Sequence, residues 1–242
     1  MSGQENLDSV GDHINASETA WSFKGAVPKT FIDHVQRSVP FYHEGHDLVC
    51  KISDFFVHDG SVCYELGAAT GALTGKLARH SKHQHVRWIG IDREEDMIRQ
   101  AQTDIGSRAG VELIVDDINI HPYEKSDFIV AYYTIQFVPP RLRQELINII
   151  YERLNWGGGF ILFEKVRAPD ARFQDMMQTL YTDFKLDQKF TPAEIMAKAK
   201  SLKGVLEPFS TQGNLDLLGR AGFKDVMTVF KHICFEGFLA IK

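Results

Sequence analysis

Short hydrophobic runs alternate with amphipathic segments along most of the chain. The runs expected to form strands are residues 62–66, 86–92, 111–117, 127–137 and 157–166. Between them, apolar residues recur at helical spacing, as Leu73 and Leu77 do after the first run. Strands and helices alternating at this length predict parallel strands joined by right-handed crossovers. Because the runs are apolar almost throughout, the pattern predicts an α/β fold whose sheet is covered on both faces.

The end of the chain breaks this alternation. Residues 217–242 predict a short helix and then two strands joined by a brief connection near residues 234–237. A connection of that length cannot hold a helical crossover, so the two strands should be antiparallel neighbours. We therefore predict a mostly parallel seven-stranded sheet with an antiparallel last strand.

Two further segments have helical patterns and lie outside the alternation. Apolar residues recur at helical spacing from Thr30 to Phe56, and Pro40 divides this stretch into two helices. A largely helical insertion follows at about residues 167–212, which we interpret as a cap over the strand ends. Residues 1–20 are polar and aperiodic and indicate a loosely ordered arm. The expected organisation is one domain over residues 21–242, with an N-terminal helical cap at residues 21–58.

The composition is that of an ordinary soluble protein. The 242 residues are 44% hydrophobic, which is enough for one large domain with a substantial core. A net charge of -5, and the lack of a lysine-rich stripe with interleaved aromatic residues, argue against direct nucleic-acid binding. No signal peptide and no membrane span of about 18 apolar residues is recognisable, so we expect a cytoplasmic protein. Cys50, Cys63 and Cys234 show no disulfide or zinc spacing, so no metal site is predicted and buried thiols are expected.

A glycine turn after the first predicted strand indicates a ligand site. The strand reaches Glu65, then Gly67-Ala68-Ala69-Thr70-Gly71 follows, and a helix begins. This order bends the backbone so that a ligand can approach closely, although two glycines could also serve tight packing. A dinucleotide site would need G-x-G-x-x-G for the pyrophosphate, and that spacing is absent. The ligand is therefore expected to lack a pyrophosphate.

Acidic residues end the neighbouring strands. Asp92 follows Gly71 by roughly twenty residues, where an acid accepts hydrogen bonds from a ribose diol. Asp117 ends the third strand, where a carboxylate can meet an adenine amino group. Taken alone, Glu65 or Asp92 could instead cap a helix. Together, the acids around one crevice describe an adenosyl ligand with a cationic amino-acid tail, which is S-adenosylmethionine.

Several stretches of the chain carry a resemblance to a known family. They are FIDHVQRSVPFY (31–42), YELGAATG (64–71), IGIDREEDMI (89–98), YTIQFVPPRLRQELINIIYERLNWGG (133–158), DFK (183–185) and AGF (221–223). With them the sequence resembles the class I S-adenosylmethionine-dependent methyltransferases. More narrowly, it resembles the carboxy-S-adenosylmethionine synthases of the tRNA wobble-uridine pathway. The resemblance implies a Rossmann-like class I methyltransferase fold, S-adenosylmethionine or a carboxylated derivative as cofactor, and a homodimer.

The resemblance also implies a cofactor pocket. In it, Tyr42 from the N-terminal helical cap would reach over the methionine portion of the cofactor. The other residues that it implies are Gly67, Ala68, Ala69, Asp92, Arg93, Asp117, Ile118 and Tyr132. Glu65 and Gly71 of the glycine turn complete the expected cofactor-binding set.

Two positions depart from the synthases that the chain resembles. Those synthases carry asparagine at the position of Tyr132, and at the position of Ala199 they carry an arginine that holds the extra carboxylate of their product. A guanidinium can bind a carboxylate through two parallel hydrogen bonds, whereas the ammonium of Lys198 or Lys200 is a flexible point charge. The departure at Ala199 therefore favours a methyltransferase with an unidentified, small-molecule acceptor.

Two other functions stay open beside methyl transfer. One is a carboxy-S-adenosylmethionine synthase that uses prephenate, with the carboxylate held by Lys198, Lys200, Arg37 or Arg172. The other is a non-catalytic S-adenosylmethionine-binding partner subunit. A sulfonium methyl group is already activated, so alignment and exclusion of water can suffice for its transfer. For this reason the catalytic residues remain unassigned.

Candidate contacts for the second substrate come mostly from the expected cap. They are Arg37, Tyr181, Lys198 and Lys200, with Glu164 and Lys165 at the end of the fifth strand as further candidates. His34, His43 and His121 are possible acid–base groups, although such histidines are more often surface or hydrogen-bonded residues.

Overall fold

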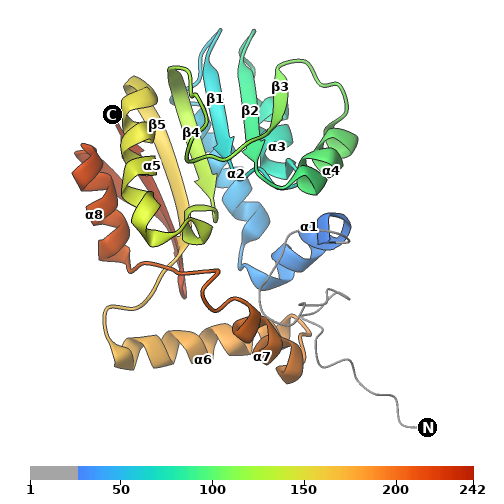
Figure 1. Cartoon of the computed structure of the whole chain (residues 1–242), viewed down its shortest axis with the longest axis vertical. Helices are drawn as coiled ribbons and strands as arrows, with labels where there is room; N and C mark the ends of the chain where they lie inside the picture. Colours follow the sequence, from blue (N-terminus) through green and yellow to red (C-terminus); the bar gives the residue numbers. More distant parts are fainter. Residues whose placement is uncertain (1–26) are drawn as a thin grey trace.

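The computed structural model describes residues 27–242, in which seven strands form one sheet (Figure 1). The strands are β1 (Val62–Leu66), β2 (Arg87–Asp92), β3 (Val111–Val115), β4 (Ser126–Tyr132), β5 (Leu154–Lys165), β6 (Asp225–His232) and β7 (Phe235–Ile241). Their order is β3-β2-β1-β4-β5-β7-β6, and β7 is antiparallel to both of its neighbours. The predicted sheet is confirmed, with the antiparallel strand inserted between β5 and β6. The predicted arm, and residues 21–26 of the predicted cap, lie outside the described residues.

Helices cover both faces of the sheet. On one side lie α2 (Tyr42–Ser53), α3 (Ala72–His80) and α4 (Glu95–Ile105), and on the other α5 (Pro140–Arg153) and α8 (Thr211–Ala221) (Figure 1). The two-residue period of β1 sends Cys63 into the core cluster with α2 and α3, and Tyr64 and Leu66 into the cluster with α5 and α8. Cys50, Cys63 and Cys234 are buried free thiols, as expected. Within residues 27–242, none of the helices has the length and hydrophobicity needed to cross a membrane.

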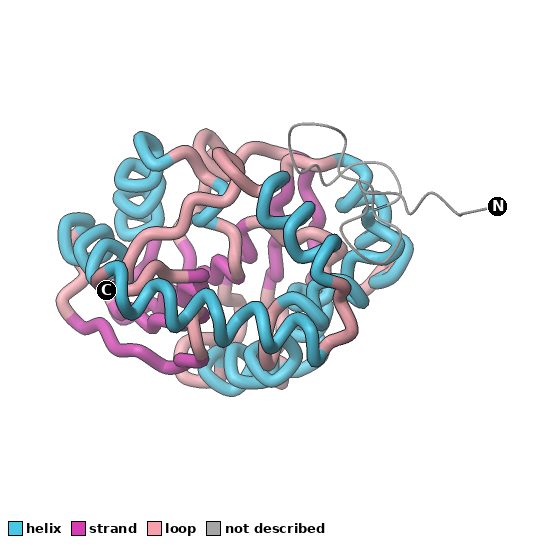
Figure 2. Tube along the Cα trace, turned by 90° about the horizontal axis from the view of Figure 1, so that it is seen from below, coloured by secondary structure: helices cyan, strands magenta, loops and turns pink. Residues whose placement is uncertain are grey.

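The remaining helices lie across the carboxyl ends of the strands. They are α1 (Val27–Ser38), α6 (Ala171–Asp187) and α7 (Pro192–Ser201), below the strand arrowheads in Figure 1 and in front of the strands in Figure 2. The predicted break at Pro40 is confirmed, since α1 ends at Ser38 and Phe41 has a positive φ of 56° before α2 begins. A capping box between Thr191 and Glu194 starts α7. In parallel sheets this edge is where ligands bind.

The fourth strand is shorter than predicted. It ends at Tyr132, Tyr133 has a positive φ of 60°, and the 3-10 helix η1 (Ile135–Phe137) follows. The continuous apolar run conceals this turn, because periodicity alone does not separate a buried strand from a short helical turn. Gln136 closes the turn, since its Nε2 donates to Tyr133 O (3.1 Å) and its Oε1 accepts from the Lys165 N–H (3.0 Å). The turn is thereby joined to the end of β5.

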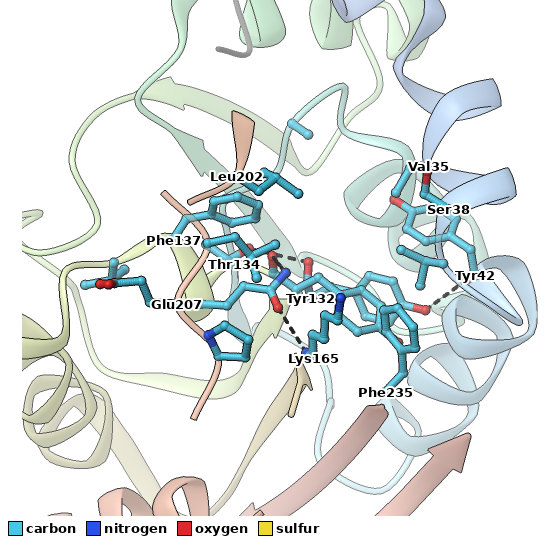
Figure 3. Close-up of a pocket in the computed structure, with 18 of the residues that line it drawn as sticks. Val35, Ser38, Tyr42, Tyr132, Thr134, Phe137, Lys165, Leu202, Glu207 and Phe235 are labelled. Atoms are coloured by element: carbon cyan, nitrogen blue, oxygen red, sulfur yellow. Dashed lines mark hydrogen bonds between the residues drawn. The ribbon is translucent and has the colours of Figure 1, made fainter. Parts of the chain in front are cut away.

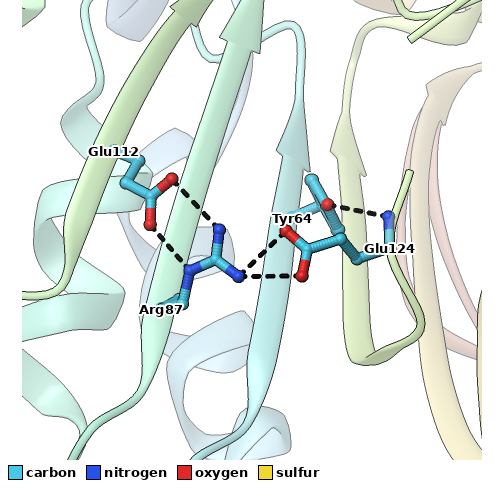
Figure 4. A network of polar contacts seen from close by, with 4 residues as sticks. All are labelled: Tyr64, Arg87, Glu112 and Glu124. Carbon is cyan, nitrogen blue, oxygen red and sulfur yellow. Dashed lines mark hydrogen bonds and ion pairs between the residues drawn. The ribbon is translucent and has the colours of Figure 1, made fainter. Parts of the chain in front are cut away.

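An ion-pair network near the amino ends of β2 and β3 also reaches the segment before β4, at the edge of the sheet opposite the cap. Arg87 donates through Nε to Glu112 (2.7 Å) and through Nη1 to Glu124 (2.9 Å), whose backbone N–H donates to the Tyr64 hydroxyl (Figure 4). The hydrogen bond from Arg87 lowers the pKa of Glu112. Because the charged side chains are 38–55% exposed, we expect each pair to contribute about 1 kcal/mol or less.

Candidate active site

A cavity of about 670 Å³ lies between the carboxyl ends of the strands and the cap helices (Figure 3). Its size falls in the range of roughly 300–1,000 Å³ that is typical of small-molecule sites. Most of the expected cofactor residues line it, namely Tyr42, Glu65, Gly67, Ala68, Ala69, Asp92, Arg93, Asp117, Ile118 and Tyr132. The three acids that were expected to share one crevice therefore do so.

Asp92 braces the glycine turn. Its Oδ2 accepts from the Ala69 N–H and its Oδ1 from the Glu94 N–H, both at 2.9 Å. Burial raises the pKa of this carboxyl group. A carboxylate oxygen has room for more than one hydrogen bond, so Asp92 can also accept from a ligand diol. Asp92 does not cap α4, whose N-cap is Glu94, so its bonds in the turn leave it able to serve a ligand as well.

Glu65 is buried at the end of β1, beneath the cavity. It is 6% exposed, and its Oε2 accepts a hydrogen bond from the Thr74 hydroxyl. Burial raises the pKa of Glu65 to about 8. The carboxyl group is therefore mostly protonated at neutral pH until a cation comes close to it.

The loop after β3 presents polar groups to the other end of the cavity. Asp117 accepts from the backbone N–H (2.9 Å) and the side-chain amide (2.7 Å) of Asn119. The side-chain oxygen of Asn119 is buried and has no hydrogen-bond partner among residues 27–242. Asp116 and Asn119 also line the cavity, and sequence reasoning missed both. Their positions directly beside Asp117 were the available signal.

The glycines of the turn serve packing more than ligand access. A Cβ at Gly67 would overlap the Thr134 side chain, and φ is +71° there. A Cβ at Gly71 would lie 2.7 Å from Ile105 on α4. Gly71 lies outside the cavity lining, between Thr70 and Ala72, which line it. The packing alternative was the better interpretation for Gly71.

Tyr132 lines the cavity but directs its hydroxyl away from it. The hydroxyl donates to the Tyr42 carbonyl (2.9 Å), as Figure 3 shows, and the ring packs against His46 and Phe163. A Cβ on Gly45 would overlap that hydroxyl. Gly45 therefore gives the tyrosine the space that it needs. The lack of a side chain at Gly45, on α2, thus makes room for a tyrosine where the synthases that the chain resembles carry asparagine.

The expected substrate residues divide into two groups. Tyr181 and Lys198 line the cavity, whereas Arg37 and Lys200 lie outside its lining. The Nε of Arg37 donates to Gln188 O (3.0 Å), and its guanidinium lies 4.4 Å from the Phe190 ring centre, so it joins α1 to the end of α6. Lys200 is exposed on α7. Tyr181 and Lys198 are therefore the better-placed candidates for contact with a second substrate.

The further candidates divide in the same way. His34 and Lys165 line the cavity, while His43, His121, Glu164 and Arg172 lie outside its lining. Burial, with Lys198 and Lys185 nearby, lowers the pKa of His34 to about 3, so its imidazole is neutral. His121 is bonded to Asp116 at 2.7 Å. Lys185 also lines the cavity and was not singled out, although it belongs to the DFK stretch.

Comparison with known proteins gives likenesses over different parts of the chain. A family model described as a methyltransferase domain matches residues 64–158. A carboxy-S-adenosyl-L-methionine synthase of Staphylococcus epidermidis is 35% identical over 230 residues, which cover 95% of this chain and 100% of that protein. The enzyme of the same name from Campylobacter lari is 33% identical, over 93% of this chain and 96% of that protein.

Solved structures share the fold at low identity. The S-adenosylmethionine-dependent methyltransferase SibL, in its apo form, superposes with a TM-score of 0.60 at 16% identity, over 84% of this chain and 55% of that chain. Human N-acetylserotonin methyltransferase in complex with SAM superposes with a TM-score of 0.58 at 16% identity, over 92% of this chain and 60% of that chain. The expected methyltransferase fold is confirmed.

Proposed function

The chain belongs to the carboxy-S-adenosyl-L-methionine synthase family of S-adenosylmethionine-dependent transferases, and on that premise we propose that it carboxylates S-adenosylmethionine with prephenate as the carboxyl donor. Methyl transfer to a small acceptor was the first expectation, because Ala199 replaces the family arginine. Relatives that match over their whole length favour the synthase alternative instead. We propose that its product serves tRNA wobble-uridine modification, with the enzyme acting in the cytoplasm.

The cavity residues fit S-adenosylmethionine. Asp92 can accept from the ribose diol, and Asp117 and Asn119, which line the other end of the cavity, offer polar groups to the adenine. Glu65 can face the cationic amino-acid tail, beneath the ring of Tyr42. A non-catalytic partner subunit that binds the cofactor would need the same residues, so we favour the enzyme because the chain matches enzymes over 93–95% of its length.

The bound cofactor supplies a methyl carbon whose hydrogens are acidified by the adjoining sulfonium. Prephenate supplies the carboxyl group when its ring C–CO₂⁻ bond breaks and its hydroxide leaves, which makes the ring aromatic and yields phenylpyruvate. The new C–C bond forms at the methyl carbon, and the displaced proton leaves with the hydroxide as water. The residues of the chain then have to hold the two substrates together and stabilise the added carboxylate.

The position of Lys198 in the cavity, beside Ala199, is the observation that supports this proposal most strongly. Four cations were weighed as replacements for the family arginine: Lys198, Lys200, Arg37 and Arg172. Lys198 lines the cavity and is 8% exposed, beside Ala199 on α7. The other three lie outside the cavity lining. A buried ammonium next to the substituted position can hold the added carboxylate, with one contact point where arginine has two.

The test is to incubate the protein with S-adenosylmethionine and prephenate and to read the nucleoside by mass spectrometry. We expect a product that carries one carboxyl group in place of a hydrogen, with an equal amount of phenylpyruvate. Lys198→Met should lower the yield about 10- to 100-fold, as the loss of a charged hydrogen bond implies. Ala199→Arg should raise it.

Lys200→Met is the matched control, since Lys200 is exposed on the same helix. It should behave as the unaltered protein does. If the protein binds S-adenosylmethionine but forms no carboxylated nucleoside, the proposal is wrong and methyl transfer becomes the better assignment.

Cofactor binding should release a proton near pH 7. The pKa of Glu65 is about 8 in the free protein, and a nearby ammonium favours its ionised form. Calorimetry in buffers of different ionisation enthalpy measures the release, which should fall as the pH rises past 8. Glu65→Gln should abolish it. Equal heats in all buffers at pH 7 would show that the cationic tail lies elsewhere.

We also propose that the enzyme is a homodimer. Phe173, Met176 and Leu180 form one stripe along α6 and are 50–55% exposed. Contiguous exposed apolar surface of this kind marks an interaction site. Light scattering on the eluted protein should give twice the monomer mass, and Leu180→Glu should reduce it to the monomer mass. A monomer in the unaltered protein would contradict this.

A further inference from the structure

We propose that Lys165 and Lys185 form a twin-ammonium subsite, which binds the carboxylate that the 2-oxo acid co-substrate keeps through the reaction. The inference rests on the proposed function and extends it, because it assigns to the second substrate its own residues. For prephenate, this is the carboxylate of the pyruvyl side chain, which stays in phenylpyruvate.

Both ammonium groups flank one aromatic ring. The Nζ of Lys165 lies 4.2 Å from the centre of the Tyr181 ring, and that of Lys185 lies 4.8 Å from it. Cations at this distance from an aromatic ring are attracted to it. Tyr181 itself is held in place, since its hydroxyl donates to Ser38 O of α1 (2.8 Å) and its ring packs edge-on against Phe235. A fixed ring thus orders two cations that come from different elements.

The two charges are poorly compensated. Among residues 27–242, neither Lys165 nor Lys185 has a carboxylate within ion-pair distance. Lys185 is 8% exposed and is the buried residue of α6. Burial and the neighbouring Lys165 lower the pKa of Lys185 to about 8, and burial also lowers that of Lys165. Such burial costs stability, and a bound anion would offset the cost.

Charge is divided along the carboxyl edge of the sheet. Asp92 ends β2 and Asp117 follows β3, at one side of the strand order, and Glu65 lies near the end of β1 beside them. Lys165 ends β5 on the other side, where α6 brings Lys185. All five residues line one cavity. The acidic half suits the cationic nucleoside, which leaves the basic half for an anionic partner.

The subsite determines which of the two prephenate carboxylates is retained and which is transferred. An ammonium that pairs with a carboxylate stabilises it as an anion and so opposes its loss as CO₂. The transferred carboxyl group must therefore lie away from the two lysines, toward the sulfonium. Anchoring the pyruvyl carboxylate holds the substrate without this penalty. It also means that phenylpyruvate, which keeps the pyruvyl carboxylate, binds to the same two lysines.

Phenylpyruvate is accordingly the probe. Its binding to the full chain saturated with S-adenosylmethionine is measured by calorimetry, for the unaltered protein, Lys165→Met, Lys185→Met and the control Lys200→Met. Each of the first two substitutions should weaken phenylpyruvate binding about 10- to 100-fold and raise the KM for prephenate similarly. The affinity for S-adenosylmethionine should not change. Lys200→Met should leave all three quantities as they are.

Stability separates this role from a structural one. Replacing a buried, unpaired ammonium with an apolar side chain of similar length should keep or raise the melting temperature of Lys185→Met. If the melting temperature falls while phenylpyruvate binding is retained, the lysine is structural and the inference is wrong.

The outcomes also separate this inference from the proposed function. Lysine-dependent binding of phenylpyruvate by a protein that forms no carboxylated nucleoside would support the subsite and overturn the function. A carboxylated product with unchanged KM and phenylpyruvate affinity in both variants would support the function and overturn the subsite.

Discussion

Asp92→Ala is expected to weaken S-adenosylmethionine binding by about 2–4 kcal/mol, or roughly 30- to 1,000-fold. The substitution removes a charged acceptor for the ribose diol. It also leaves the Ala69 and Glu94 N–H groups, each bonded to Asp92 at 2.9 Å, without their partner. The glycine turn would therefore lose the group that joins it to the start of α4. Calorimetric titration with the cofactor measures the effect.

Two further variants serve as an intermediate case and a control for this measurement. Asp92→Asn keeps one side-chain oxygen but loses the charge, so its affinity should fall between those of the alanine variant and the unaltered protein. Asp104→Ala, on the exposed side of α4, should bind normally. An alanine variant at position 92 that folds and binds with undiminished affinity would remove Asp92 from the cofactor site.

Gly45→Ala and Tyr132→Asn should together destabilise the protein by less than the sum of their separate effects. The alanine Cβ would overlap the Tyr132 hydroxyl, an overpacking that costs about 1–3 kcal/mol. The asparagine would leave a void where the ring packs against His46 and Phe163, and would cost about 3 kcal/mol or more. In the double variant the added methyl group enters space that the ring has left. We expect the interaction to recover about 1 kcal/mol or more.

Urea unfolding of the four proteins gives this cycle. Gly219→Ala is the control, because a Cβ at that position of α8 has open space around it, so this variant should be neutral or stabilising. Additive effects of the two substitutions would contradict the account that Gly45 makes room for the Tyr132 hydroxyl.

Local patterns were sufficient to predict the sheet. Each strand of the parallel part is a continuous apolar run, and Pro40 and the glycine turn mark breaks that depend on one or two residues. The end of β4 was not predictable in this way. Its apolar run continues into η1, and the turn between them depends on Gln136 bonding to Lys165, a residue on another strand.

The site was predictable where one strand end determines the position of a residue. Asp92 ends β2, Glu65 is the penultimate residue of β1, and Asp117 lies two residues after β3, so topology alone brings the three together. Lys185 was missed and the packing of Gly71 was not foreseen, because the partners of both residues lie far along the chain. Gly71 packs against α4, and Lys185 on α6 lies beside the Tyr181 ring together with Lys165 from the end of β5. Helical periodicity predicts which face of a helix is buried, but it does not predict which residues that face contacts.

The position of β7 constrains the order in which the sheet is assembled during synthesis. β6 precedes β7 in the chain, yet it reaches the rest of the sheet through β7, which pairs with β5 on its other side. When β6 leaves the ribosome, its docking partner does not yet exist, and the edge of β5 is still open. This half of the sheet therefore closes as a hairpin that docks in one late event, after the strands holding the cofactor site have already been made.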